Sequence, residues 1–361
     1  MKRRWLGYTA LGLLAGCFLL LVWATQQVVR PKYLGAVIEG NFTEEYYRDP
    51  TRHDLLVIGN CDSYENISTM KLWADYGITS FIRGNANQLV SQSYYLLMDA
   101  LERETPRVVL FNVQAMTVAA QGTEEYNRMV LDGMHWGRNK LAAIQACAME
   151  EEHLAEYLLP VLRYHSRWGE LEADDFRYAF RKKPLTSFNG YYLRADVRPA
   201  TEFPRERRRA DDSFPSGNWQ YLDRIREACA QRGIRLILMK APSLYPEWKD
   251  AYEQQILEYA GTYDLPYYNF LELAEEAGLD MEQDTYDGGL HLNVYGAEKI
   301  ADYLGPVLTG EMGLGDHRRE AETAAWYEAR LAAYQEEKSR QEEEFRELGY
   351  IRRFARDDGW E

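Results

Sequence analysis

Residues 55–67 read LLVIGNCDSYENI, and this stretch decides the fold. A run of apolar residues ends at Gly59, and polar residues lead from there into a segment with a helical pattern. The pattern predicts a buried strand, a tight turn and a helix, an arrangement in which many hydrolases place a nucleophile on the turn. Cys61 and Ser63 are the two candidates for that role.

The rest of the chain repeats this alternation of strand and helix. Strands are predicted at 54–59, 78–84, 106–113, 233–242 and 265–270, and helices at 68–77, 87–104, 219–232, 247–263 and 295–308. Strands separated by helices indicate an α/β protein with a five-stranded parallel sheet in flavodoxin-like order, covered by helices on both faces. Ligands bind at the carboxyl ends of the strands in such sheets.

Two segments around this repeat have other characters. Residues 113–216, between the third and fourth strands, are predicted to contain helices at 139–163 and to form a helical cap over the strand ends. Residues 311–361 are predicted to form a charged helical tail, either solvated or in contact with a partner. The α/β domain itself is expected to span residues 31–310.

Residues 1–30 predict an N-terminal membrane anchor. Three basic residues precede an uncharged run at 5–29, which is long enough to cross a hydrocarbon core of roughly 30 Å as a helix. The basic cluster favours an inside N-terminus, with residues 31–361 outside the cytoplasm. Residues 14–17, Leu-Ala-Gly-Cys, match a lipoprotein cleavage box with Cys17 as the alternative anchor point, and a cleaved signal peptide is a third reading. All three readings export the body of the protein.

Composition narrows the possible partners. The formal net charge of −15 argues against nucleic acid and against electrostatic docking on anionic lipid. The 27 tyrosines and 9 tryptophans, beside many carboxylates, suit a protein that handles carbohydrate. Cys147 and Cys229 lie in helical patterns and are predicted to be small buried residues, whereas Cys61 has polar neighbours.

A second polar cluster precedes the last predicted helix. Residues 284–296 read DTYDGGLHLNVYG and contain Asp284, Asp287 and His291. A nucleophile after the first strand and an acid–histidine pair before the last helix can meet at one edge of the sheet. The histidine would take the proton of the nucleophile, and the carboxylate would hold the imidazole tautomer. These three residues could instead bind a metal, but no further histidine or thiol cluster accompanies them, so neither a metal nor a cofactor is expected.

These motifs resemble those of the SGNH/GDSL hydrolase superfamily, in particular its membrane-anchored bacterial members that acylate the cell envelope, such as proteins of alginate O-acetylation and teichoic-acid D-alanylation. The resemblance covers roughly residues 52–112 and 217–308. It implies that Cys61 occupies the nucleophile position and that Asp287 and His291 form the acid–histidine block, with Asp284 as the alternative acid. It also implies that Gly84 donates a backbone N–H to the oxyanion and that Asn112, or Asn87 in its place, supplies the side-chain donor.

The chain departs from that family at several positions. Cysteine stands at position 61 where the family has serine, and Asn60 stands where many members have aspartate. Asp287 precedes His291 by four residues, whereas the usual spacing in the family is three. If the turn began two residues later, Ser63 would be the nucleophile. A thiol beside an imidazole ionises readily, so cysteine at this position is compatible with activity.

Three further residues are candidates for substrate binding. His165 and Arg167 lie in the aromatic-rich part of the predicted cap, and Lys240 leaves the fourth strand near the same edge of the sheet. Their alternative reading is structural: a polar cluster among aromatics for the first two, and a solvated strand end for the third.

The sequence thus supports three functions. The first is an extracytoplasmic O-acyltransferase that carries an acyl group on Cys61 and passes it to a cell-envelope polysaccharide. The resemblance implies that a multi-pass membrane O-acyltransferase would be its partner and acyl supplier. The second is an esterase on the same scaffold, and the third is a catalytically silent module that binds glycan or scaffolds a membrane acylation complex.

Overall fold

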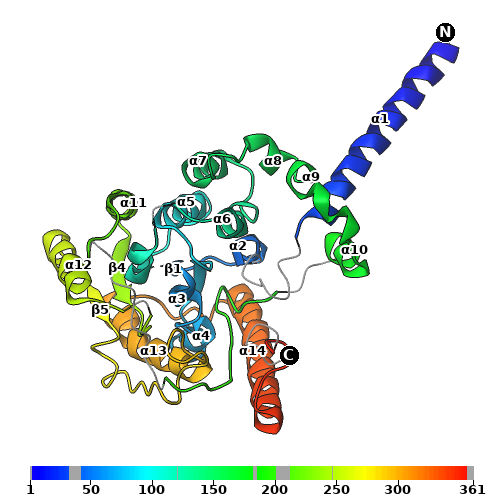
Figure 1. The fold of residues 1–361 in the computed structure, drawn as a ribbon. Helices are drawn as coiled ribbons and strands as arrows, with labels where there is room; N and C mark the ends of the chain where they lie inside the picture. The colour runs from blue at the N-terminus through cyan, green and yellow to red at the C-terminus, as the bar shows by residue number, and fades with distance from the viewer. Residues whose placement is uncertain are drawn as a thin grey trace. The chain divides into compact units, whose positions relative to one another are not determined.

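The computed structural model describes residues 2–31, 42–119, 121–181, 185–200, 212–245 and 247–355. The chain divides into two compact units (Figure 1). Unit 1 comprises Met1–Leu34 and Met149–Leu185, and unit 2 comprises Gly35–Ala148 and Thr186–Glu361.

Unit 2 is built on a five-stranded parallel sheet. Its strands are β1 (Leu55–Gly59), β2 (Ser80–Gly84), β3 (Val108–Asn112), β4 (Arg235–Lys240) and β5 (Tyr267–Asn269). Their order, β2-β1-β3-β4-β5, is the flavodoxin-like order expected from the sequence, and the position of every predicted strand is confirmed. In register, Gly59 pairs with Gly84, so β1 and β2 end side by side.

The helices of unit 2 alternate with these strands. They are α2 (Phe42–Glu45), α3 (Cys61–Tyr64), α4 (Thr69–Tyr76), α5 (Val90–Ala100), α6 (Glu124–Leu131), α7 (Arg138–Cys147), α11 (Ser216–Ala230), α12 (Asp250–Tyr263), α13 (Val294–Pro306) and α14 (Ala321–Leu348), with short 3₁₀ helices η2 (Tyr46–Arg48) and η3 (Val113–Thr117) and a π-helical turn η5 (Val307–Glu311). Local signals fix their ends. The Ser68 hydroxyl accepts from the backbone N–H of Lys71 to cap α4, and Gly77, at φ +67°, terminates that helix.

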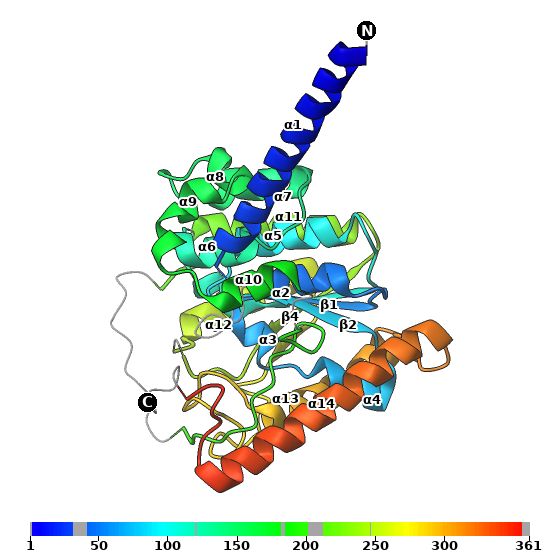
Figure 2. The same ribbon diagram turned by 90° about the vertical axis from the view of Figure 1, so that its right-hand side faces the viewer.

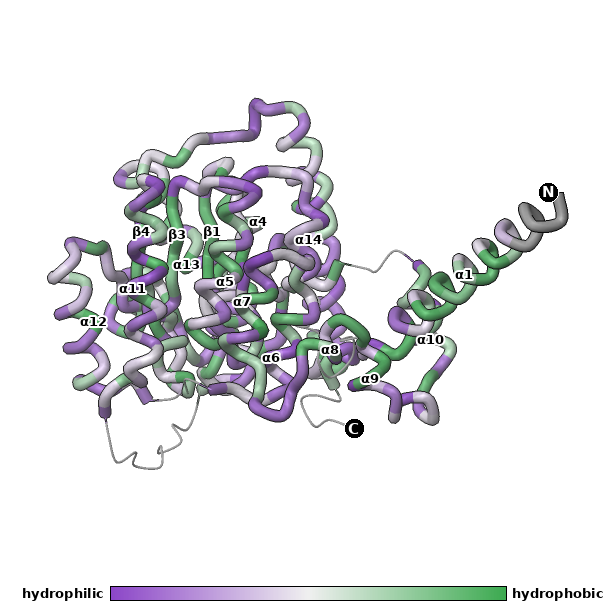
Figure 3. The backbone as a smooth tube through the Cα atoms, turned by 90° about the horizontal axis from the view of Figure 1, so that it is seen from above, coloured by the Kyte–Doolittle hydropathy of each residue, from purple (hydrophilic) through white to green (hydrophobic). Residues whose placement is uncertain are grey.

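Both faces of the sheet are buried, which makes unit 2 a three-layer α/β structure (Figure 2). Leu55 and Val57 pack on one side with residues of α4, α13 and α14. Leu56 and Ile58, which alternate with them, pack on the other side with residues of α5, α11 and α12. β1 and β3 are accordingly apolar along most of their length, as the hydropathy colouring shows (Figure 3).

The C-terminal tail differs from the expected solvated helix. Tyr327, Tyr334 and Gln341 on α14 are buried, and Ile351 and Phe354 beyond it join the core. The three helical positions are seven residues apart, so they form one narrow stripe along a helix that is otherwise charged. The Tyr334 hydroxyl, for example, accepts a hydrogen bond of 3.2 Å from Ser68 Oγ at the start of α4.

The segment predicted as a cap, 113–216, is not one body. Its residues Met149–Leu185 belong to unit 1, whereas η3, α6 and α7 belong to unit 2, where α7 packs against α5. The helices expected at 139–163 are present: α7 ends at Cys147, and α8 begins at Leu154.

Unit 1 contains the N-terminal helix. Its elements are α1 (Lys2–Val29), α8 (Leu154–Leu158), α9 (Val161–Tyr164), the 3₁₀ helix η4 (His165–Gly169) and α10 (Ala173–Phe180). The span Tyr8–Val29 of α1 has a mean hydropathy of 1.8 and is long and apolar enough to cross a membrane or to serve as a signal sequence.

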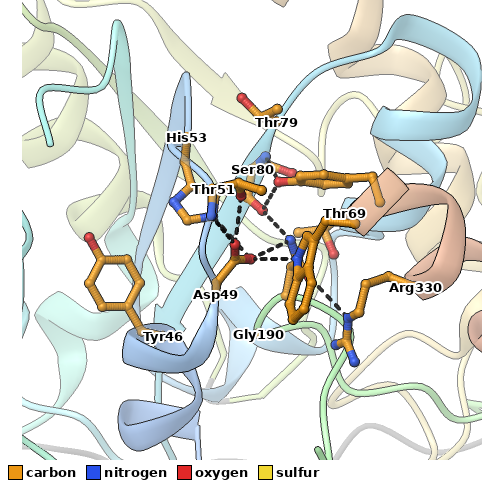
Figure 4. A network of polar contacts seen from close by, with 12 residues as sticks. Tyr46, Asp49, Thr51, His53, Thr69, Thr79, Ser80, Gly190 and Arg330 are labelled. Atoms are coloured by element: carbon orange, nitrogen blue, oxygen red, sulfur yellow. Dashed lines mark hydrogen bonds and ion pairs between the residues drawn. The ribbon is translucent and has the colours of Figure 1, made fainter. Parts of the chain in front are cut away.

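A buried polar network around Asp49 joins distant segments of unit 2 (Figure 4). The Asp49 carboxylate accepts hydrogen bonds from the Thr51 hydroxyl at 2.6 Å and from Trp326 Nε1 of α14 at 3.2 Å. His53 Nε2 lies 3.3 Å from the same carboxylate, an ion-pair distance without hydrogen-bond geometry, and its Nδ1 lies 3.0 Å from Glu104. Burial alone would lower the pKa of His53, but the two carboxylates outweigh it and raise the pKa to about 9.

His53→Gln should therefore reduce the free energy of unfolding by about 3 kcal/mol at neutral pH, because it leaves two buried carboxylates without their cation. Since the pKa of His53 is higher in the folded state, its contribution is complete below the unfolded pKa of about 6.5 and is lost as the pH rises through about 9. Urea unfolding across this pH range should show that the unfolding free energies of the variant and the wild type converge at high pH. His165→Gln, on an exposed histidine, is the control. A difference in unfolding free energy between the variant and the wild type that stays constant with pH would contradict the raised pKa of His53.

Candidate functional site

The end of β1 sets the position of Cys61. Gly59 has φ +152°, and a Cβ there would lie 2.3 Å from Ser63 Oγ, so the tight turn requires glycine. Cys61 is the first residue of the single-turn helix α3 and is half-buried. Ser63 is completely buried against the strand end, and its hydroxyl has no hydrogen-bond partner among the described residues. Of the two candidates for nucleophile, Cys61 is the accessible one.

The loop before α13 presents His291 to the same edge of the sheet. Gly288 and Gly289 take positive φ values of 82° and 105°, which let the chain turn sharply. Asp287 Oδ1 accepts from the backbone N–H of His291 at 2.8 Å, so the carboxylate fixes the backbone as well as the ring. The backbone N–H of Leu292 donates to Asn66 Oδ1 at 2.7 Å, which ties this loop to the segment after α3.

The structure brings Cys61, His291 and Asp287 together. The Cys61 sulfur and a His291 ring nitrogen lie within 4.8 Å of each other, despite a separation of 230 residues in the chain. His291 Nδ1 lies 2.7 Å from Asp287 Oδ2. His291 Nε2 is buried and has no hydrogen-bond partner in the part of the chain that the structure describes. Because Nδ1 faces the carboxylate, Nε2 is the nitrogen left for the thiol.

Glu65 is a second carboxylate at the imidazole that the sequence motifs do not indicate. Its Oε2 lies 3.3 Å from His291 Nδ1 and accepts a hydrogen bond from the Tyr286 hydroxyl. Glu65 follows Cys61 by four residues, about one helical turn. This spacing is the feature of the sequence that could have placed Glu65 near Cys61. The guanidinium of Arg194 lies 4.1 Å from the centre of the Tyr286 ring, so a buried cation packs on the tyrosine that donates to Glu65.

The charges around His291 favour its protonated form. Burial opposes a charge on the ring, but the negative charges of Glu65, Cys61 and Asp287 outweigh it and raise the pKa of His291 well above its usual value. Burial would raise the pKa of Asp287, and His291 more than compensates, so this pKa is lowered. Burial raises the pKa of the Cys61 thiol, and the positive charge of His291 opposes this rise. A proton that leaves the thiol therefore has a well-stabilised acceptor.

Asp284 serves a different contact. Its carboxylate pairs with Lys299 of α13 at 2.6 Å and accepts from the backbone N–H of Asp280 at 2.7 Å. The carboxylate at His291 Nδ1 is thus Asp287, and Asp284 braces the loop onto α13.

The two predicted oxyanion donors lie at the ends of β2 and β3, the two strands that flank β1. A Cβ on Gly84 would lie 3.1 Å from the Asn60 carbonyl oxygen, so the end of β2 closely approaches the turn that carries Cys61. Asn112 ends β3; its side-chain oxygen accepts from the backbone N–H of Gln114 at 3.1 Å, and its Nδ2 has no hydrogen-bond partner among the described residues. The rival, Asn87, is exposed in a left-handed turn at φ +47°.

Lys240 lies beneath the site and not on its rim. Its ammonium is completely buried and donates to the carbonyls of Ala241 at 2.5 Å and Ser243 at 3.0 Å. Burial lowers the pKa of Lys240 to about 8, against the opposing charge of Asp62. The Ser243 hydroxyl hydrogen-bonds the Asp62 carboxylate, so Lys240 braces a loop that in turn contacts the neighbour of Cys61.

One set of side chains has the donor atoms of a metal site. A thiol sulfur, a carboxylate oxygen and a ring nitrogen from Cys61, Asp62 and His291 lie within 4.8 Å of one another. These are ligand types that zinc accepts. The set shares only His291 with the Asp284–Asp287–His291 cluster considered from the sequence.

His165 and Arg167 belong to unit 1. His165 is exposed, and its Nδ1 lies 3.0 Å from the Leu162 carbonyl oxygen. Arg167 donates to the Val29 carbonyl at 2.8 Å and to Asp175 at 3.0 Å. These contacts are those of a structural cluster, and substrate binding by the two residues stays a prediction.

The chain matches no protein-family model and no curated protein.

Proposed function

We propose that this protein is an SGNH-like O-acyltransferase that works outside the cytoplasm on a cell-envelope polysaccharide and carries the acyl group on Cys61. One observation carries the proposal: the Cys61 sulfur lies within 4.8 Å of a ring nitrogen of His291, and His291 Nδ1 is held 2.7 Å from Asp287. A nucleophile, a base and an orienting carboxylate in this relation form a catalytic triad.

In the first step, His291 takes the thiol proton, and the Cys61 sulfur attacks the carbonyl carbon of an acyl donor. The tetrahedral oxyanion collapses to a thioester on Cys61, and the imidazolium gives its proton to the departing oxygen of the donor. Asp287 and Glu65 stabilise the imidazolium between these events, since both face Nδ1.

In the second step, a hydroxyl of the polysaccharide attacks the thioester. His291 removes the hydroxyl proton, the C–S bond breaks, and the proton returns to the Cys61 sulfur as the product ester leaves. The Gly84 backbone N–H and the Asn112 side-chain amide are the proposed oxyanion donors; the amide of Asn112 is buried and unpaired among the described residues.

The N-terminal helix supports a function at the membrane. An anchor at Tyr8–Val29 would hold the site close to a membrane-embedded acyl supplier, which favours transfer over the hydrolysis of diffusible esters. The proposed partner is therefore a multi-pass membrane O-acyltransferase.

The acceptor distinguishes transfer from hydrolysis. Full-length protein in detergent micelles, given p-nitrophenyl acetate as donor, should release p-nitrophenol faster as envelope polysaccharide is added, and isotopically labelled acetyl should appear on the polysaccharide. Release that does not depend on the polysaccharide, with free acetate as product, would instead identify an esterase. The absence of both products would leave the proposal without support.

A further inference from the structure

Unit 1 carries an unusual concentration of exposed apolar side chains. Outside α1, the described residues include eleven large apolar side chains that are exposed, and seven of them lie on or between the short helices of unit 1. These seven, here called the apolar face, are Leu154, Leu158, Leu159, Leu162, Trp168, Phe176 and Phe180. Large exposed apolar patches on soluble surfaces mark contacts with a membrane or a protein.

The apolar face meets the C-terminal end of α1 at Phe180. The rings of Trp23 and Phe180 lie 6.4 Å apart. Two polar contacts fix the same junction: the backbone N–H of Val161 donates to Gln26 Oε1 at 2.8 Å, and Arg167 donates to the Val29 carbonyl. Figure 1 shows α9 and α10 beside this end of α1.

The position of these contacts along α1 indicates that the apolar face contacts lipid. Trp23 and Gln26 lie in the last two turns of the apolar span, where a membrane-crossing helix leaves the hydrocarbon core. Side chains held at this level meet the headgroup and upper acyl-chain region, where tryptophan and phenylalanine partition well. Acidic residues such as Glu156 and Glu172 stand among the basic ones, so the attraction is apolar and not electrostatic.

We infer that the apolar face of unit 1 lies in the lipid interface beside α1, so that α8–α10 lie on the membrane surface at the end of the anchor. This inference rests on the proposed anchoring of α1 and is independent of the acyl-transfer chemistry. It assigns residues 154–180, which the sequence pattern placed in a cap, to contact with the bilayer.

Photolabelling tests the inference. Full-length protein is reconstituted into zwitterionic phosphatidylcholine vesicles that contain a phospholipid with a photoactivatable group near the headgroup, and labelled peptides are mapped by mass spectrometry. We expect label in peptides from both α1 and residues 154–180, and none in α14. The double variant Leu158→Glu/Phe176→Glu should lose about tenfold of the label in 154–180 while the label in α1 is kept, because carboxylates stay in water.

Leu257→Glu, which changes an exposed leucine of unit 2, is the matched control and should leave the labelling unchanged. Label in α1 without label in 154–180 would overturn the inference and leave the anchor intact. No label in either segment would overturn the anchor as well. Cross-linking of residues 154–180 to another protein in native membranes, with no lipid label in vesicles, would identify a protein partner and refute the lipid assignment.

Discussion

Replacing Cys61 with alanine should reduce acyl transfer by about three orders of magnitude or more, because removal of a triad nucleophile leaves only binding and oxyanion stabilisation. Ser63→Ala should keep nearly full activity. The Ser63 hydroxyl is buried against Gly59 without a partner among the described residues, so its loss removes no satisfied hydrogen bond. The measurement is kcat/KM for transfer from p-nitrophenyl acetate to the polysaccharide.

Two further substitutions control this result. Cys229→Ala, at a buried cysteine of α11, tests whether loss of any thiol inactivates the protein. Cys61→Ser should retain part of the activity, since the resembling family uses serine at the corresponding turn. Wild-type activity in Cys61→Ala together with inactivity in Ser63→Ala would exchange the roles of the two residues. Wild-type activity in both would favour the silent binding module.

Asp287→Asn should lower kcat by about 10³- to 10⁴-fold, because an amide at Nδ1 no longer holds the productive tautomer or stabilises the imidazolium. Asp284→Asn provides a matched control: it is the same substitution in the same loop, at a carboxylate that pairs with Lys299 and not with His291. Its effect should fall mainly on stability. Glu65→Gln should lower kcat less than Asp287→Asn does, since Glu65 lies farther from Nδ1, at 3.3 Å.

Steady-state kinetics and thermal unfolding of the three variants separate these roles. Equal losses of kcat in Asp284→Asn and Asp287→Asn, with both proteins folded, would refute Asp287 as the orienting carboxylate. A greater loss in Glu65→Gln than in Asp287→Asn would make Glu65 the third member of the triad.

The sheet was predictable from the sequence because its strands are short apolar runs bounded by polar or glycine residues. Both faces of the sheet are buried, so β1 and β3 are continuous apolar runs, and at five residues each they are too short for a typical helix. The same reasoning located Cys61 and His291, since parallel strands bring their carboxyl ends to one edge and the last loop returns to it.

Features that depend on tertiary packing were not predictable in the same way. The tail was expected to be a solvated or partner-binding helix, because only every seventh residue of α14 is buried and the charges between them mask the stripe. The segment 113–216 was treated as one cap, yet contacts such as that of Val161 with Gln26 place its middle with α1. Glu65 was missed because the resemblance supplies only one carboxylate for the histidine, and the second comes from the turn after the nucleophile.

The most direct test of the central claim is the detection of an acyl group on Cys61. Full-length protein mixed with p-nitrophenyl acetate and no polysaccharide, quenched in acid and digested, should yield the peptide containing Cys61 with one added acetyl group. The adduct should be removed by neutral hydroxylamine, as a thioester is, and should disappear on addition of the polysaccharide. Asp287→Asn should accumulate it more slowly. Acetyl found on Ser63, or found on Cys61 but not lost to the acceptor, would contradict the account.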